Sequence, residues 1–337
     1  MTAAEVATPV LSIDGLRVAF RKGGTETTAV HDVSVQVGAG EIVGLIGESG
    51  SGKSLTCRSA LRLLPRGGRV VAGEVNVGGR DVLTMSTAEL RELRARRLGM
   101  IFQDPFTSLN PTLRIGRQLV ETLRVNAGLD DRAARERAVE LLTQVEIPRP
   151  AERLRVYPHE LSGGMRQRVM LALAISAQPA LLIADEPTTA LDVSTQAQVL
   201  ALIKRLRDER GMSILLVSHD FGVIAALCDR VVVMYGGFVV ESGTVAQVYM
   251  TPRHPYTRAL LDAVPTLEVP PRGYRRPAIP GPPLGTIRYE EGCPFEPRCR
   301  FARTECRHVD MSRALRADGH LSACPFVDTH ADLQVRA

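Results

Sequence analysis

Apolar and polar positions along the 337-residue chain fall into segments of different period. Residues 10–20 alternate well enough to predict a strand, and the apolar run at 41–46 (EIVGLI) precedes a glycine, as a buried strand does before a turn. A helix is predicted next, over 54–64. From about 111 to 177 helix formers dominate. There the stretches ETLRVNAGL and ERAVELLTQV place apolar residues three and four positions apart, which predicts a region of amphipathic helices.

Strands and helices alternate after this helical region. The apolar runs ALLIA, SILLVS and RVVVMY are each typical of a buried strand, and helices are predicted between them, over about 194–209 and after Asp220. Such alternation predicts a protein of the α/β class, with a parallel sheet covered by helices on both faces.

The composition changes after about residue 265. The stretch at 269–285, VPPRGYRRPAIPGPPLG, is dense in proline and glycine, which sustain neither helix nor sheet, so a linker is predicted there. We therefore predict a main domain over residues 1–265 and a small C-terminal domain over residues 266–337.

Composition and charge narrow the function classes only a little. Hydrophobic residues make up 45% of the chain and charged residues 23%, which is typical of a globular protein and excludes a disordered tail. The net charge of +5 permits nucleic acid or an acidic membrane surface as a partner, but the 4% of aromatic residues disfavours stacking on single-stranded nucleic acid. No apolar run reaches the roughly 20 residues of a membrane span, and the first ten residues lack the pattern of an export signal.

The strongest single motif lies at residues 47–54, which match G-x-x-x-x-G-K-[ST] between a predicted strand and a predicted helix. The glycines let backbone N–H groups face phosphate oxygens, and the start of the helix adds a favourable dipole. Lys53 would reach the β- and γ-phosphates of a nucleotide, and Ser54 would offer its hydroxyl to Mg²⁺. An ordinary glycine turn is the alternative. The expected phosphate contacts are Gly47, Glu48, Ser49, Gly50, Ser51, Gly52, Lys53 and Ser54.

A second element is the apolar run LLIADE, which ends in two carboxylates, Asp185 and Glu186. A carboxylate at the end of a buried strand is costly unless something compensates its charge, and Mg²⁺ would do so. We expect Asp185 to hold the ion, through water, and Glu186 to orient or deprotonate the attacking water. The alternative is a plain strand end before a turn at Pro187.

Residues 161–167, LSGGMRQ, resemble the signature loop of ATP-binding-cassette (ABC) proteins and lie upstream of the acidic strand at the family's usual distance. Gln103 in IFQDP is similar to the family's Q-loop glutamine, Asp192 to its D-loop aspartate and His219 in LLVSHD to its switch histidine. The resemblance implies the fold of a P-loop NTPase of the ABC type, with a helical subdomain at about 111–178 and an antiparallel β portion.

The resemblance also implies an ATPase in which two such domains pair head to tail around two ATP molecules. Each nucleotide would lie on one chain's phosphate loop and under the signature loop of the other, where Ser162, Gly163 and Gly164 approach the γ-phosphate. His219 would donate to the same phosphate. Gln103 would sense the magnesium and the attacking water.

Two further positions concern the nucleotide itself. Phe20 matches the place where this family stacks an aromatic ring on adenine, with plain core packing as the alternative. Leu55 stands where the family commonly has a threonine whose hydroxyl touches the α-phosphate. That contact is therefore expected from a backbone N–H or from Thr56.

Three stretches resemble the ATP-binding subunits of oligopeptide, dipeptide and nickel importers: QDPFTSLNP at 103–111, SGGMRQRVMLALA, and PRHPYT at 252–257. They imply an ATPase that powers the import of peptides, with nickel or another small solute as the alternative cargo. The implied partners are a homologous second ATPase subunit, two transmembrane permeases and an extracytoplasmic solute-binding protein. The chain would lie peripherally on the cytoplasmic face of the membrane, and residues 103–111 would contact a coupling helix of the permease.

A soluble cassette protein acting on nucleic acid or the ribosome is the less favoured class. Such proteins usually carry tandem cassettes or a long coiled coil between the phosphate loop and the signature, and the sequence has neither. We therefore expect no nucleic-acid partner. The cargo is expected to be chosen by the binding protein and the permeases.

The six cysteines fall into two groups. Cys57 and Cys228 lie singly in apolar helical contexts and are predicted to be small buried hydrophobes. The other four crowd near the end of the chain; they are Cys293, Cys299, Cys306 and Cys324. Disulfides are disfavoured without an export signal, whereas four thiols can hold zinc or an iron–sulfur cluster.

The spacing of these four cysteines lacks the close C-x₂-C pairs of zinc ribbons. The segment GCPFEPRC resembles the C-terminal domain of the importers, in which some members hold a [4Fe–4S] cluster on four cysteines. The resemblance thus implies such a cluster as a structural clasp of a small Cys-rich domain. Zinc and plain structural thiols stay open as alternatives.

Overall fold

The computed structural model describes residues 8–22, 24–103, 108–189, 191–264, 279–281, 284, 291–311 and 315–327. They form two compact units, each assembled from separate stretches of the chain. The first unit comprises Met1–Leu11, Val37–Glu41 and Asn76–Val217, and the second comprises Ser12–Gln36, Ile42–Val75 and Ser218–Ala337. Most of the linker predicted at 269–285 lies outside the described residues, so the boundary at 265 stays a prediction.

The first unit contains the parallel sheet that the apolar runs predict. Its strands are β6 (Leu98–Ile101), β7 (Leu181–Asp185) and β8 (Ser213–Ser218), in the order β6-β7-β8, and both pairings are parallel. Every residue of β7 and β8 is buried. Strands covered on both faces have no polar side, which is why these stretches are continuously apolar in the sequence.

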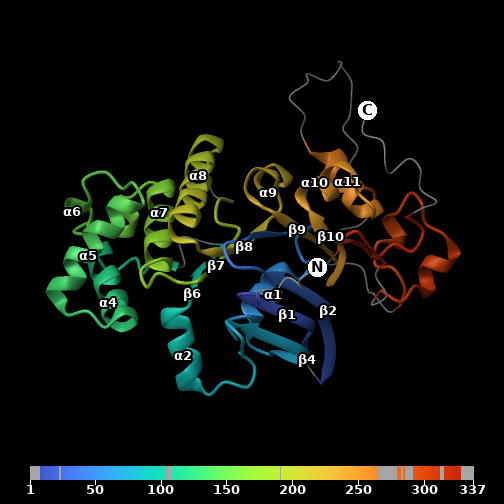
Figure 1. Cartoon of the computed structure of the whole chain (residues 1–337), viewed down its shortest axis with the longest axis horizontal. Helices are drawn as coiled ribbons and strands as arrows, with labels where there is room; N and C mark the ends of the chain where they lie inside the picture. Colours follow the sequence, from blue (N-terminus) through green and yellow to red (C-terminus); the bar gives the residue numbers. More distant parts are fainter. Residues whose placement is uncertain are drawn as a thin grey trace, which may run out of the picture. The chain divides into compact units, whose positions relative to one another are not determined.

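The predicted helical region is confirmed in the first unit. Its helices are α2 (Thr87–Arg96), α4 (Ile115–Ala127), α5 (Asp131–Gln144), α6 (Pro150–Arg153), α7 (Gly163–Ala174) and α8 (Val193–Arg210). Figure 1 shows α4, α5 and α6 gathered beside α7. The helix α4 buries Ile115, Leu119 and Leu123, which follow the spacing that the sequence analysis used. A short strand, β5 (Arg80–Asp81), pairs with Asn76 and Val77.

The second unit contains two sheets. One has the order β2-β1-β4, formed by β1 (Leu11–Lys22), β2 (Thr25–Val37) and β4 (Gly68–Val77). The other has the order β11-β12-β10-β9-β3. Its strands are β3 (Ile42–Ile46), β9 (Arg230–Tyr235), β10 (Phe238–Thr244), β11 (Leu315–Ala317) and β12 (His320–Ser322). Only the β3–β9 pair is parallel among the pairings described in this sheet.

The helices of the second unit are short. They are α1 (Lys53–Ser59), α9 (Phe221–Leu227), α10 (Val245–Met250) and α11 (Pro255–Ala263), with 3₁₀ turns at Glu296–Arg298 (η3) and Thr304–His308 (η4). The prediction of a helix over 54–64 was wrong at its end, because α1 stops at Ser59. Arg62 has φ +49° there, and the Leu63 N–H donates to the Arg58 carbonyl, so a left-handed turn closes the helix.

The described part of the C-terminal extension continues a sheet of the second unit. Strand β12 pairs antiparallel with β10, with Glu241 opposite Ser322. Glu241 is completely buried, and its carboxylate accepts hydrogen bonds from the backbone N–H groups of Arg253 and His254 while His320 Nε2 lies 2.7 Å from its Oε1. A buried carboxylate needs such partners, so these contacts tie the extension to β10.

The packing of α7 against α8 yields a test of the fold in the first unit. A Cβ added to Gly164 would lie 2.4 Å from Thr195 Cγ2, whereas one added to Gly163 would approach nothing closer than 3.5 Å. The Thr195 hydroxyl is bonded to Asp192, so its side chain cannot easily turn away. Gly164→Ala should therefore destabilise the protein by about 1–3 kcal/mol.

Gly163→Ala is the matched control and should change the stability by less than about 0.5 kcal/mol. Urea unfolding followed by circular dichroism measures both variants. Equal midpoints for the two variants would contradict this account of the helix packing.

Candidate functional site

The loop between β3 and α1 has the backbone that a phosphate cradle needs. A Cβ on Gly47 would lie 2.1 Å from the carbonyl oxygen of Met234, so only glycine fits at the end of β3. Gly50 and Gly52 have φ values of +84° and +99°, in the region that side chains disfavour. The glycines of the motif are thus required by the close approach of β9 and by the turns of the loop itself.

Lys53 lies inside this loop and is 5% exposed. Its Nζ donates to the carbonyl oxygens of Gly47, at 2.8 Å, and Glu48, at 2.9 Å, and lies 3.4 Å from Ser51 Oγ. The loop therefore curls around a positive charge, as an anion site does.

Two predicted contacts near the start of α1 have different surroundings. The hydroxyl of Thr56 donates to the Gly52 carbonyl at 3.1 Å, and the side chain is completely buried. The Thr56 hydroxyl is already hydrogen-bonded at the start of α1. Of the two expected sources of the α-phosphate contact, the backbone N–H is therefore the better candidate. Ser54 and Leu55 are half-buried.

Phe20 lies at the end of β1, half-buried, with its ring against the backbone of β4. A Cβ on Gly68 would lie 2.9 Å from Phe20 Cε1. The ring thus has a packing partner in the second unit, and the adenine contact stays a prediction.

The two carboxylates of the acidic strand lie at the end of β7 in the first unit. Asp185 is completely buried. Glu186 has φ +50°, which is uncommon for a residue with a side chain and indicates local backbone strain. The Glu186 N–H donates to the Val217 carbonyl at 3.1 Å, which holds the backbone in this conformation.

The structure brings Gln103 and Glu186 together. Gln103 Nε2 donates to Glu186 Oε2 at 3.0 Å, and Thr189 Oγ1 donates to the same oxygen at 2.9 Å. Thr189 was missed in the sequence analysis, although its position three residues after the glutamate, in a turn, was visible there. Two donors on one oxygen give the carboxylate a defined direction.

The signature and D-loop residues lie at the starts of two neighbouring helices. Ser162 is the N-cap of α7 and accepts from the Met165 N–H, and Gly163 and Gly164 form the first turn. Asp192 is the N-cap of α8. Hydrogen bonds from the backbone and hydroxyl of Thr195 lower the pKa of the Asp192 carboxyl.

His219 belongs to the second unit, where it lies exposed between β8 and α9. The phosphate loop and Phe20 belong to the same unit, whereas Gln103, Asp185, Glu186 and the signature loop belong to the first. The stretch predicted to contact a permease, 103–111, is described only in part, because residues 104–107 lie outside the described ranges.

Comparison with known proteins agrees with these motifs. Residues 30–189 match the family described as ABC transporter, and residues 240–306 match the C-terminal region of oligopeptide/dipeptide transporters. The chain is 46% identical over 325 residues to a candidate peptide import ATP-binding protein of Brucella abortus (strain 2308), covering 96% of this chain and 97% of that protein. It is 44% identical to the oligopeptide transport ATP-binding protein OppD of Salmonella typhimurium, over 96% of this chain and 95% of OppD.

The chain belongs to the ABC transporter ATPase family. Its structure is similar to the dimeric cassette MJ0796 in a post-hydrolysis state with ADP and Pi, with 27% identity and a TM-score of 0.63. That match covers 70% of this chain and 98% of MJ0796. The predicted P-loop fold with its helical and β portions is therefore confirmed, and the chain is an ABC-type ATPase.

Two residues far from the phosphate loop in the sequence contact it: Arg298, and Tyr256 of the PRHPYT stretch. Arg298 Nη1 lies 2.7 Å from Glu48 Oε2, and the Glu48 N–H donates to Tyr256 Oη at 2.8 Å. The sequence carries no local signal for either contact, because Glu48 and Arg298 are 250 positions apart.

The six cysteines are free thiols. Cys57 and Cys228 are buried, as predicted. Burial raises the pKa of Cys293 to about 12 and that of Cys324 to about 11. The nearby thiols also contribute to both shifts, so the four C-terminal cysteines lie within electrostatic reach of one another.

The predicted [4Fe–4S] cluster, and zinc as its alternative, gain no support from this arrangement. Within the described residues, which include all four C-terminal cysteines, no group of three or more Cys, His, Asp or Glu side chains is placed to hold a metal ion. A Cys-rich domain of its own is likewise not confirmed.

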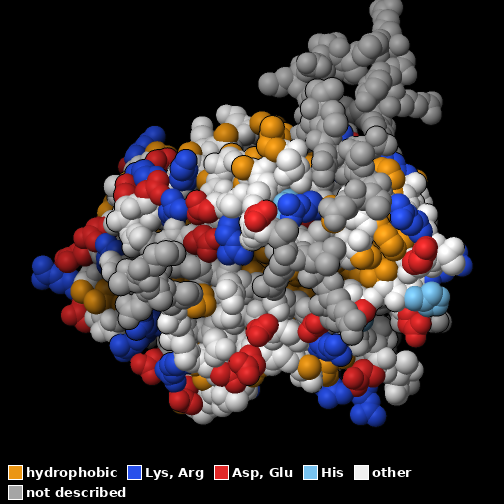
Figure 2. Space-filling view, turned by 45° about the vertical axis from the view of Figure 1, so that its right-hand side comes forward, with side chains coloured by type: hydrophobic (Ala, Val, Ile, Leu, Met, Phe, Trp, Pro, Cys, Tyr) orange, Lys and Arg blue, Asp and Glu red, His pale blue; other side chains and the backbone are white. Residues whose placement is uncertain are grey.

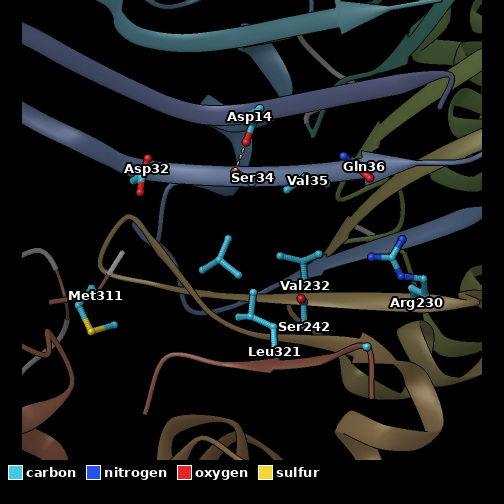
Figure 3. Close-up of a pocket in the computed structure, with 12 residues that line it drawn as sticks. Asp14, Asp32, Ser34, Val35, Gln36, Arg230, Val232, Ser242, Met311 and Leu321 are labelled. Carbon is cyan, nitrogen blue, oxygen red and sulfur yellow. Dashed lines mark hydrogen bonds between the residues drawn. The ribbon is translucent and has the colours of Figure 1, made fainter. Parts of the chain in front are cut away.

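A cavity of about 580 Å³ lies elsewhere in the second unit. Figure 3 shows it between β2 and β9, with Leu321 of β12 below and a hydrogen bond from Ser34 to Asp14 above. None of the expected nucleotide contacts lines it. The cavity is therefore separate from the predicted ATP site.

On the face in Figure 2, Lys and Arg side chains lie among Asp and Glu side chains. Arginines of α4 and α5 form ion pairs, at Arg117–Glu121, Arg124–Asp131, Arg132–Glu136 and Arg137–Glu140. Within the described part of the chain, no helix has both the length and the apolar composition that crossing a membrane requires.

Proposed function

We propose that this ATPase hydrolyses ATP at the phosphate loop and the acidic strand, and that hydrolysis powers the import of di- and oligopeptides through an ABC transporter complex. The assignment of the hydrolytic residues rests on the hydrogen bond from Gln103 to Glu186. The match of residues 240–306 to the C-terminal region of oligopeptide/dipeptide transporters supports the peptide cargo.

The phosphate loop would bind the triphosphate chain. Lys53 already lies among backbone carbonyls of the loop, and the β- and γ-phosphate oxygens would become stronger partners for its ammonium, because they carry negative charge. The N–H groups of residues 48–54 would complete the cradle.

Oxygen donors of three side chains would hold a magnesium ion. The Ser54 hydroxyl, the Gln103 amide and the buried Asp185 carboxylate are oxygen ligands of the kind Mg²⁺ prefers, and the ion would neutralise charge on the phosphate oxygens. Glu186 would orient or deprotonate the attacking water. Gln103 and Thr189 hold its Oε2, which fixes the direction of the carboxylate.

The remaining predicted residues would act across a dimer of ATPase subunits. Ser162, Gly163, Gly164 and Asp192 lie at helix starts, where N–H groups favour anions, so the signature loop could close on the γ-phosphate of a partner-bound ATP. His219 would donate to the same phosphate. The dimeric form of MJ0796 supports pairing of this kind.

The partners of the complex follow from the same proposal. They are a homologous second ATPase subunit, two permeases and an extracytoplasmic solute-binding protein. The chain would lie on the cytoplasmic face of the membrane, and its main domain, 1–265, would be followed by an extension, 266–337, of the oligopeptide-importer type.

Replacement of Glu186 tests the hydrolytic assignment. Glu186→Gln should lower the ATP turnover about a hundredfold or more while ATP still binds, because the phosphate contacts remain and only the base is lost. Steady-state ATPase assays and equilibrium binding of labelled ATP measure the two effects. Glu92→Gln, an exposed glutamate on α2, is the control and should keep full turnover. Full turnover in Glu186→Gln would refute the assignment.

Transport assays test the cargo. In cells that lack this chain, uptake of labelled di- and oligopeptides should fall to background, and wild-type protein but not Lys53→Ala should restore it. Restored nickel uptake with unchanged peptide uptake would replace peptide by nickel as the cargo.

We keep the iron–sulfur cluster as a separate proposal, supported by the four free thiols in one small region. Anaerobically purified protein should then absorb at about 400 nm and contain about four iron atoms per chain, and Cys306→Ser should lose both. An iron-free protein with one bound zinc would favour the zinc alternative, and a metal-free protein would make the thiols structural.

A further inference from the structure

The acidic residue of the phosphate loop is held by an arginine from the cysteine-bearing C-terminal segment. Arg298, at the end of η3, is 7% exposed, and its Nη1 lies 2.7 Å from Glu48 Oε2. The same nitrogen lies 3.2 Å from Tyr235 Oη. Arg298 Nε donates to the Pro280 carbonyl at 2.7 Å, so the guanidinium is fixed from two sides.

A second contact reaches the same residue from α11. The backbone N–H of Glu48 donates to Tyr256 Oη, and Tyr256 is completely buried. Its ring packs against Tyr235, with centroids 4.4 Å apart, and against Phe295, with centroids 5.3 Å apart. Phe295 itself lies three residues before Arg298, so one aromatic cluster supports both contacts to the loop.

These contacts bear directly on the peptide groups that hold Lys53. Glu48 follows Gly47, and the carbonyls of both residues accept from Lys53 Nζ. The contacts of Arg298 and Tyr256 thus fix the side chain and the N–H of the residue whose carbonyl positions the lysine. Arg298 also neutralises a carboxylate that would otherwise repel the phosphates of ATP.

We propose that Arg298 and Tyr256 are positioning residues of the phosphate loop, so that the affinity for ATP depends on the C-terminal segment. The inference rests on the proposed nucleotide site. Neither residue touches the nucleotide in this proposal, because both act through Glu48.

Steady-state kinetics separate this role from a general loss of structure. Arg298→Met should raise the KM for ATP about tenfold and leave kcat within about twofold, because the loop is misplaced before chemistry begins. Arg298→Lys should recover part of the loss, because lysine restores the positive charge but not the planar guanidinium with its fixed donors. Tyr256→Phe should raise the KM about threefold. Arg300→Met, an exposed arginine two residues away, is the control and should match wild type.

A double-mutant cycle tests whether Arg298 acts through Glu48. Glu48→Gln should raise the KM, but less than Arg298→Met does because it also removes the charge that repels the phosphates, and the double variant should be no worse than Arg298→Met alone. An unchanged KM in Arg298→Met, or a double variant whose effect is the product of the two, would overturn the proposal. Should Arg298→Met fail to fold, as judged by its thermal melt, the Tyr256→Phe and Glu48→Gln variants decide: unchanged KM values in both would overturn it.

Lys53→Ala distinguishes this inference from the proposed function. If Lys53→Ala still binds ATP as tightly as wild type, the nucleotide site itself is wrong. If Lys53→Ala loses ATP binding while Arg298→Met and Glu48→Gln keep it, only the role of the C-terminal segment is wrong.

Discussion

The buried ammonium of Lys53 is the interaction on which the site in the second unit depends. A positive charge of this kind needs several acceptors, and it takes two of them from the backbone of its own loop, at Gly47 and Glu48. The loop can turn its carbonyls inward only because glycines occupy its tight positions, and at Gly47 an added Cβ would lie only 2.1 Å from the Met234 carbonyl oxygen of β9. The loop is therefore built around a lysine that its own backbone carbonyls hold.

At the end of the acidic strand, in the first unit, the constraint is the direction of a carboxylate. There the strain at Glu186 and the two hydrogen bonds to its Oε2 fix the direction of a carboxylate. In the proposed mechanism, preorganisation of this kind would lower the cost of arranging a water molecule for attack. Binding would then be prepared by a cradle of backbone groups, and hydrolysis by an oriented side chain.

The C-terminal extension serves the second unit in two ways. Its strand β12 extends the sheet at β10 beside the buried Glu241, and its residue Arg298 lies against the phosphate loop. A buried arginine is costly unless it is paired, so loss of the Glu48 carboxylate would leave an uncompensated charge at the turn between Cys293 and Cys299. Within the described residues, the C-terminal cysteines do not belong to any group of side chains placed to hold a metal ion.

The sequence by itself determined the local elements and the motifs. Strands such as β7 and β8, the helices α4 and α5, and the phosphate loop depend on neighbours a few residues away, so their patterns are visible in the order of residues. The end of α1 at Ser59 was not visible in the sequence, because it depends on the left-handed backbone conformation of Arg62. Only the tertiary structure decided the contact between Gln103 and Glu186, the approach of Met234 to Gly47, and the pairing of Glu48 with Arg298. Residues far apart in sequence meet through the packing of whole elements, and no local pattern encodes that packing.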